Sequence, residues 1–77
     1  MKVLLFAQLE EIVGEREIEI KSEPITVGQL KEVLLERYPN LRSLDSTIVA
    51  VNEEYVKNDT LLKENDVVAL IPPVSGG

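Results

Sequence analysis

Near its C-terminal end the sequence reads VVALI at residues 67–71, an unbroken apolar stretch that stops at two prolines, Pro72 and Pro73. A short run of this kind is typical of a strand that is buried on both faces. Residues 2–9, KVLLFAQL, form a second such run at the opposite end of the chain. We therefore predict two central strands, one from each end of the sequence, that lie side by side and parallel in one sheet.

Shorter strands are predicted between these two runs. Residues 15–21 alternate charged side chains with isoleucine, as a half-buried strand does, and Gly14 marks the turn that would pair them with residues 2–9 as a hairpin. Residues 47–51 are apolar and β-branched and predict a further strand. A turn and a short return strand at residues 55–56 would follow it.

One amphipathic helix is predicted from about residue 27 to residue 38. Thr26 and Gln29 form a capping-box signature just before apolar residues that recur at helical spacing. Pro39 ends the helix, because proline lacks an amide hydrogen and disfavours the helical conformation in the residue before it. The apolar side of this helix is expected to cover one face of the sheet.

The predicted order is strand, strand, helix, strand, short strand, strand. With 77 residues the chain has room for one small core and no second domain. The pattern indicates an α+β fold with a mixed sheet and one main helix, which is the ordering of a β-grasp, or ubiquitin-like, fold. We expect a β-grasp domain over residues 1–71 and an extended C-terminal tail over residues 72–77.

The composition excludes several classes of function. The sequence has no cysteine and no histidine, so no disulfide, thiol nucleophile, imidazole base or zinc site is expected, and the chain is not expected to be an enzyme on its own. The net charge of −6 and the scattered lysines and arginines argue against nucleic acid as a partner. The acidic balance serves solubility alone or steers a basic protein partner.

Neither a signal peptide nor a membrane helix is expected. The apolar start of the chain is interrupted at Gln8 and followed by Glu10 and Glu11, so we interpret it as a strand of a cytoplasmic protein.

The last six residues carry the strongest functional signal. Pro72 and Pro73 have a fixed φ and no amide hydrogen, so they end the sheet ladder and stiffen the root of the tail. Gly76 and Gly77 have no Cβ and fit a slot that excludes any other side chain. A terminal Gly-Gly is often only a frayed end, but here it follows a core strand and a rigid Pro-Pro with no linker. We infer that the carboxylate of Gly77 is the working group, and that another enzyme must activate it because a carboxylate is a poor electrophile.

The sequence resembles the molybdopterin synthase small subunit family across essentially its whole length. The resemblance rests on residues 2–9, on Thr26-Val27, on Ala50-Val51-Asn52 and above all on ALIPPVSGG at residues 69–77. It implies a β-grasp sulfur carrier in molybdenum cofactor biosynthesis, with the catalytic pocket in the large synthase subunit and a heterotetramer as the assembly.

The resemblance also implies a sequence of reactions. The carboxylate of Gly77 would be adenylated by an E1-like enzyme, which uses ATP, and converted to a thiocarboxylate by a sulfur donor protein. The tail would then enter the large subunit and pass its sulfur to cyclic pyranopterin monophosphate. The chain itself would bind no cofactor.

The resemblance assigns roles to individual residues. Gly77 would accept AMP and then sulfur, and Gly76 would be the second slender residue of the tail. The segment in the channel of the large subunit would comprise Pro72, Pro73, Val74 and Ser75. Phe6 matches an apolar position of the family, and it either packs in the core or contacts the partner.

Two features depart from the family pattern, and other functions remain open. Glu10 stands where a basic residue is usual, and Glu64-Asn65-Asp66 replaces an Asp-Gly-Asp turn, with Asn65 expected in a left-handed conformation. The alternatives are a thiamine-type sulfur carrier, a ubiquitin-like modifier joined to lysines through Gly77, and a β-grasp binding module that does not use its tail.

Overall fold

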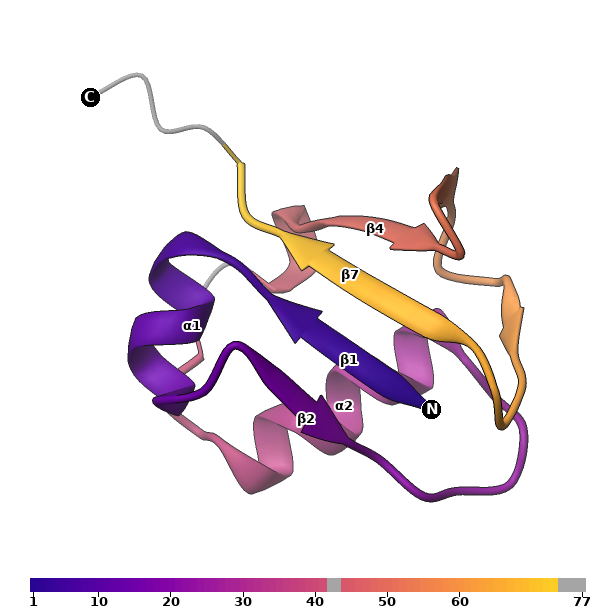
Figure 1. The fold of residues 1–77 in the computed structure, drawn as a ribbon, viewed down its shortest axis with the longest axis horizontal. Helices are drawn as coiled ribbons and strands as arrows, with labels where there is room; N and C mark the ends of the chain where they lie inside the picture. Colours follow the sequence, from indigo (N-terminus) through magenta and orange to yellow (C-terminus); the bar gives the residue numbers. More distant parts are fainter. Residues whose placement is uncertain (42–43, 74–77) are drawn as a thin grey trace.

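The chain forms a five-stranded mixed sheet with helix α2 across one face and a separate two-stranded sheet (Figure 1). The structure is a computed structural model and describes residues 1–41 and 44–73. Its strands are β1 (Lys2–Leu5), β2 (Glu17–Glu19), β3 (Ile25–Thr26), β4 (Ile48–Val51), β5 (Glu54–Val56), β6 (Leu61–Leu62) and β7 (Val67–Ile71). Its helices are α1 (Ala7–Val13), α2 (Val27–Arg37) and the single 3-10 turn η1 (Leu44–Ser46).

The order of the strands confirms the predicted centre of the sheet. The five strands lie in the order β2-β1-β7-β4-β5, and β3 pairs with β6 in the second sheet. Strands β1 and β7 are parallel, in a register that places Lys2 opposite Val67 and Leu5 opposite Leu70. Strand β2 is antiparallel to β1, and β4 is antiparallel to β7. The α+β, β-grasp class expected from the sequence is therefore confirmed.

Helix α2 and the sheet enclose the core. The predicted capping box is present, because Thr26 Oγ1 accepts from the Gln29 amide at 3.2 Å and Gln29 Oε1 accepts from the Thr26 amide at 2.8 Å. Leu30 and Leu34 are fully buried on the inner side of the helix. On the sheet, the residues that face them are equally buried, among them Val3, Leu5, Val68 and Leu70.

The prediction of one long first strand over residues 2–9 is wrong after Leu5. The chain turns there into helix α1, which the sequence analysis missed. Leu9 is buried and Val13, four residues later, packs against the core, so the apolar residues of this segment serve a helix face. Gly14, predicted as a hairpin turn, is the C-cap of α1: its φ is 87° and its amide donates to the Glu10 carbonyl at 2.8 Å.

The left-handed backbone predicted for Asn65 lies elsewhere. Asn65 is not among the residues with positive φ, whereas Asn52 and Glu53 have φ values of 51° and 73°. Two successive residues of this kind between β4 and β5 are typical of a two-residue hairpin turn with the twist of the strands. The polar turn before β7 instead closes by a hydrogen bond from the Asp66 amide to the Lys63 carbonyl at 3.1 Å.

Candidate functional site: the open sheet face and the root of the tail

Helix α2 covers one face of the large sheet, and no helix of the described residues covers the opposite face (Figure 1). Residues directly opposite one another in a ladder point to the same face, and the register pairs Leu4 with Ala69, Ala69 with Ala50 and Ala50 with Tyr55. Ile48 and Ile71 form a further pair on this face. We call this surface the open face and define it by Leu4, Ile48, Ala50, Tyr55, Ala69 and Ile71.

The open face exposes large apolar side chains. Tyr55 is 78% exposed and Ile48 is 47% exposed, although both belong to regular strands. Leu4, Ala69 and Ile71 are half-buried and continue this face across β7 and β1. A contiguous apolar surface of this kind on a small domain is typical of a protein interaction site.

The root of the tail lies at one end of the open face. Ile71 and Ile48 are the last register pair of the β4–β7 ladder, and Pro72 follows directly. Pro72 is buried whereas Pro73 is exposed, so the described chain leaves the folded surface between these two residues. The first proline therefore anchors the tail against the domain.

Phe6 lies at the same end of the sheet. It follows Leu5, whose partner in β7 is Leu70, and it is the N-cap residue of α1. Its side chain is 41% exposed, so the interpretation of Phe6 as a core residue is wrong. An exposed phenylalanine beside the root of the tail is consistent with the other interpretation, a contact with a partner.

Acidic and paired charges border the open face on the β2 side. Lys2 and Leu4 lie opposite Glu19 and Glu17, respectively, and the Lys2 ammonium is 3.7 Å from the Glu17 carboxylate. Glu10, which stands where the family pattern has a basic residue, belongs to α1, and its carboxylate lies 3.5 Å from the Arg16 guanidinium. A positive charge is thus present in space next to the position where the sequence has an acid.

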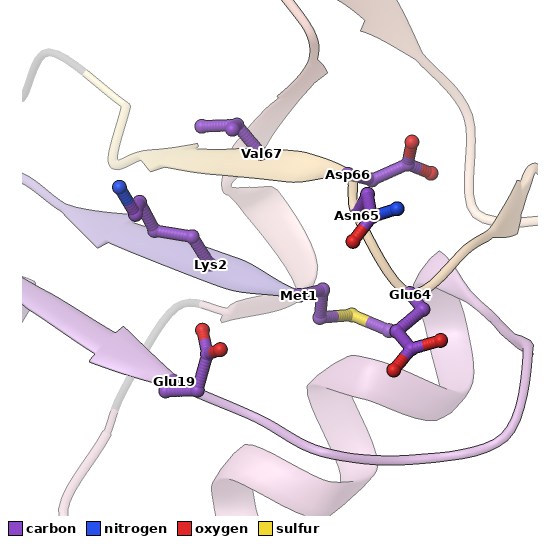
Figure 2. A pocket seen from close by; sticks show the side chains of 7 residues that line it. All are labelled: Met1, Lys2, Glu19, Glu64, Asn65, Asp66 and Val67. Atoms are coloured by element: carbon purple, nitrogen blue, oxygen red, sulfur yellow. The ribbon is translucent and has the colours of Figure 1, made fainter.

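The structure also has a polar hollow, in which hydrogen bonds within the fold hold the carboxylate of Asp66. Figure 2 shows this hollow of about 220 Å³, which is lined by residues of β1, β2 and the turn before β7, including Glu19, Glu64 and Asp66. The Asp66 carboxylate accepts hydrogen bonds from the Lys63 amide at 2.8 Å and the Asn52 side chain at 3.0 Å. These bonds, the Lys63 amide first, hold the pKa of Asp66 below its ordinary value.

The described part of the chain has neither a metal-binding cluster nor a membrane-spanning helix. Residues 1–41 and 44–73 contain no group of three or more histidine, cysteine, aspartate or glutamate side chains placed to hold a metal ion. Within the same ranges, no helix has the length and apolar character needed to cross a membrane.

The structure therefore brings together three of the residues assigned from the sequence, namely Phe6, Pro72 and Pro73. Residues 74–77, which include Val74, Ser75, Gly76 and Gly77, lie outside the described residues, so their roles stay predictions. The sequence analysis missed Tyr55 and Ile48 as surface residues. Only alternation along β4 and β5 could have pointed to them, and the unbroken apolar run of β4 hides it.

Comparisons with known proteins place the chain in a family. The ThiS family model matches residues 3–77. The molybdopterin synthase sulfur carrier subunit of Dictyostelium discoideum is 40% identical over 99% of this chain and 94% of its own length. The match therefore spans both the folded domain and the tail.

Two solved structures share the fold. The crystal structure of small archaeal modifier protein 1 from Haloferax volcanii has a TM-score of 0.84 and 30% identity, and the match covers 96% of this chain and 97% of that one. A structure of the complex of subunits 1 and 2 of the molybdopterin-converting factor from Helicobacter pylori has a TM-score of 0.69 and 30% identity, with 99% and 96% covered. The chain belongs to the ThiS family and is related along its whole length to molybdopterin synthase sulfur carrier subunits.

Proposed function

We propose that this protein is the sulfur carrier subunit of a molybdopterin synthase and acts through a thiocarboxylate on Gly77. The observation that carries the proposal is the position of the tail root: Pro72 leaves the domain at the end of an exposed apolar sheet face, next to Phe6. A partner that covers this face lies directly over the point where the tail begins. The relationship to sulfur carrier subunits supports the same conclusion.

The chemistry begins at the carboxylate of Gly77. A carboxylate oxygen attacks the α-phosphorus of ATP in an E1-like enzyme, pyrophosphate leaves, and an acyl-adenylate forms. Sulfur at the sulfide level, delivered by a sulfur donor protein, then attacks the acyl carbon, the bond to AMP breaks, and a thiocarboxylate remains. In the large subunit this sulfur forms a bond to cyclic pyranopterin monophosphate, and water then cleaves the bond between the acyl carbon and the sulfur, which returns the carrier to a carboxylate. All of these steps take place in the cytoplasm.

The folded domain contributes binding and orientation. The open face docks on the large subunit, and burial of Tyr55 and Ile48 in that interface supplies apolar contact area. Pro72 sets the direction in which the tail leaves the domain, and Pro73, Val74 and Ser75 span the channel of the large subunit. Gly76 and Gly77 complete the tail because a slot that admits only backbone excludes larger residues. Two carriers and two large subunits form the heterotetramer.

The experiment compares three forms of the tail in a reconstituted reaction. The wild-type chain, a chain lacking Gly77 and a chain with one added residue after Gly77 are each incubated with activating enzyme, ATP, a sulfide source and the large subunit. Intact mass detects the replacement of one oxygen by sulfur in the wild-type chain alone. The two altered chains should unfold at the same denaturant concentration as wild type and yield no molybdopterin.

Molybdopterin formation by an extended chain that mass spectrometry shows to be uncleaved would overturn the proposal. The protein would then act through its folded surface alone.

A second candidate function is favoured by the similarity to small archaeal modifier protein 1. As a protein modifier, the chain would use the same acyl-adenylate but form an isopeptide bond between Gly77 and a lysine of another protein. Peptide mass spectrometry of total protein from the native host separates the two functions. A branched peptide that carries residues 64–77, the segment after Lys63, joined to a lysine of another protein selects the modifier. A free thiocarboxylate on the intact chain selects the sulfur carrier.

A further inference from the structure

Lys31 has a buried side-chain stem, and the described residues supply no counter-ion for its ammonium group. It lies on α2 next to Leu30, and its residue surface is only 5% exposed. Within residues 1–41 and 44–73 it takes part in no ion pair and no side-chain hydrogen bond. Because an unpaired charge is costly to seal from solvent, the ammonium group has to reach the surface while the rest of the side chain is buried.

The Lys31 side chain lines a hollow of about 340 Å³ beside the first turn of α2, together with Gly28, Glu32, Leu35 and Asn58. The described residues contain no side-chain nitrogen or oxygen that is both sealed from solvent and unbonded. The Lys31 ammonium has no partner, so it must reach accessible space, and the hollow that Lys31 lines provides this space. The buried stem and open end aim the charge into the hollow.

The backbone amides at the start of α2 are not the binding groups. The Val27 amide donates to the Thr60 carbonyl at 2.9 Å, and the Gly28 amide donates to the Asn58 carbonyl at 3.0 Å. The Gln29 amide is taken by the capping hydroxyl of Thr26. The donors left for a ligand include the Lys31 ammonium and the side-chain amide of Asn58, which has no hydrogen bond within the described part of the chain. The side-chain NH2 of Gln29 also remains, because the capping box uses only its Oε1.

We propose that this hollow receives the carboxylate of an aspartate or glutamate side chain of a second protein. The ammonium of Lys31 and the amide of Asn58 would donate to the carboxylate oxygens, and Leu35, 39% exposed at the edge of the hollow, would contact an apolar neighbour of the acid. Charge complementarity selects the carboxylate, because Lys31 is the cation that lines the hollow and it forms no ion pair among the described residues, Glu32 included.

The same charges favour a protein-borne carboxylate over a small free anion. The chain carries a net charge of −6, and Glu32 lines the hollow beside Lys31, so a free anion meets repulsion and gains one cationic contact. An acid on a protein that binds through additional contacts reaches the hollow at a high effective concentration. Because α2 lies across the sheet from the open face, this protein can bind while the open face is occupied (Figure 1).

The first test uses a minimal probe, the capped dipeptide acetyl-Leu-Glu-amide, with acetyl-Leu-Gln-amide as its uncharged control. Titration is followed by the amide resonances of the 15N-labelled full chain. We expect saturable shifts centred on Gly28 and Asn58 and a dissociation constant on the order of millimolar for the Glu peptide. The Gln peptide should bind at least about tenfold more weakly. Equal affinity for both peptides, or shifts that do not localise to these residues, would overturn the proposal.

The second test removes the charge and keeps the buried stem. Lys31→Met should weaken binding of the Glu peptide about tenfold or more. Lys57→Met is the matched control: it changes the net charge equally at an exposed lysine and should leave binding unchanged. If Lys31→Met does not fold, Asn58→Ala at an exposed position provides the readout and should weaken the Glu peptide about threefold or more. If a folded Lys31→Met chain binds the Glu peptide with wild-type affinity, the proposal is wrong. The same holds for Asn58→Ala where that variant provides the readout. A loss of affinity in Lys57→Met equal to that in the test variant also contradicts the proposal.

Discussion

The side-chain amide of Asn52 joins the β4–β5 turn to Asp66: its Nδ2 donates to Asp66 Oδ1 at 3.0 Å, while its Oδ1 accepts from the Val67 amide at 3.0 Å. The backbone of Asn52 has a positive φ and donates its own amide to the Val67 carbonyl at 2.8 Å. This network locks together the two turns that flank the start of β7. It therefore sets the register of the strand that leads to the tail.

Asp66 should make stability depend on acid pH. Hydrogen bonds from the Lys63 amide and from Asn52 hold its folded pKa below the ordinary value of 3.8, so the fold favours the carboxylate. The resulting stabilisation is fully present above the unfolded pKa and is lost as the pH falls through the lower, folded pKa. Asp66→Asn, which offers one acceptor oxygen in place of two, should cost about 1–2 kcal/mol at neutral pH.

Urea unfolding of both proteins across the acid range tests this prediction. The difference in unfolding free energy between wild type and Asp66→Asn should shrink as the pH drops below 3.8. A constant difference at all pH values would show that the Asp66 charge does not contribute.

Two glycines should respond to alanine with opposite signs. Gly14 has a φ of 87°, so Gly14→Ala should destabilise the fold by about 1 kcal/mol through backbone strain alone, because no atom lies within 4 Å of the added Cβ. Gly28 lies in α2 at an ordinary φ, and its added Cβ would meet Asn58 at 3.6 Å, a normal contact. Gly28→Ala should therefore stabilise by up to about 1 kcal/mol. If the thermal unfolding midpoints of both variants move in the same direction, this pair of predictions is wrong.

Leu30 should be among the most sensitive positions of the core. It is fully buried between α2 and the sheet, so Leu30→Ala should lower the free energy of unfolding by about 2–5 kcal/mol, a large share of what a small domain has. Leu35, five residues further along the same helix and 39% exposed, is the control, and Leu35→Ala should cost less than about 1 kcal/mol. Similar losses of unfolding free energy in both variants would show that the buried face of α2 is assigned wrongly.

Tyr55 should contribute to partner binding and little to folding. On the proposed function, Tyr55→Ala should weaken association with the large subunit by about 1–4 kcal/mol, because an exposed aromatic side chain loses its contact area. Leu61, 54% exposed on β6 of the other sheet, gives a matched control, and Leu61→Ala should bind as wild type does. Calorimetric titration measures both. Unchanged affinity in Tyr55→Ala would show that the open face is not part of the interface.

The sequence determined those parts of the structure whose signals are local. Thr26 and Gln29 marked the start of α2, and the apolar run at residues 67–71 marked β7, because capping and hydrophobic runs depend on neighbouring residues. The parallel pairing of β1 with β7 followed from these runs and the order of elements. The Pro-Pro-Val-Ser-Gly-Gly ending likewise pointed to the tail as the chemical group without any coordinates.

Only the tertiary structure decided which apolar residues face solvent. In a strand of unbroken apolar residues such as β4, nothing local distinguishes Ile48 from Val49, and the position of α2 alone makes one 47% exposed and the other buried. The exposure of Phe6 is a further case. Phe6 lies between the end of β1 and the start of α1, and these boundaries depend on the packing of Leu9 in the core. The burial of Lys31 could not be predicted either, because a lysine in an amphipathic helix is ordinarily solvated and only the packing around α2 encloses its stem.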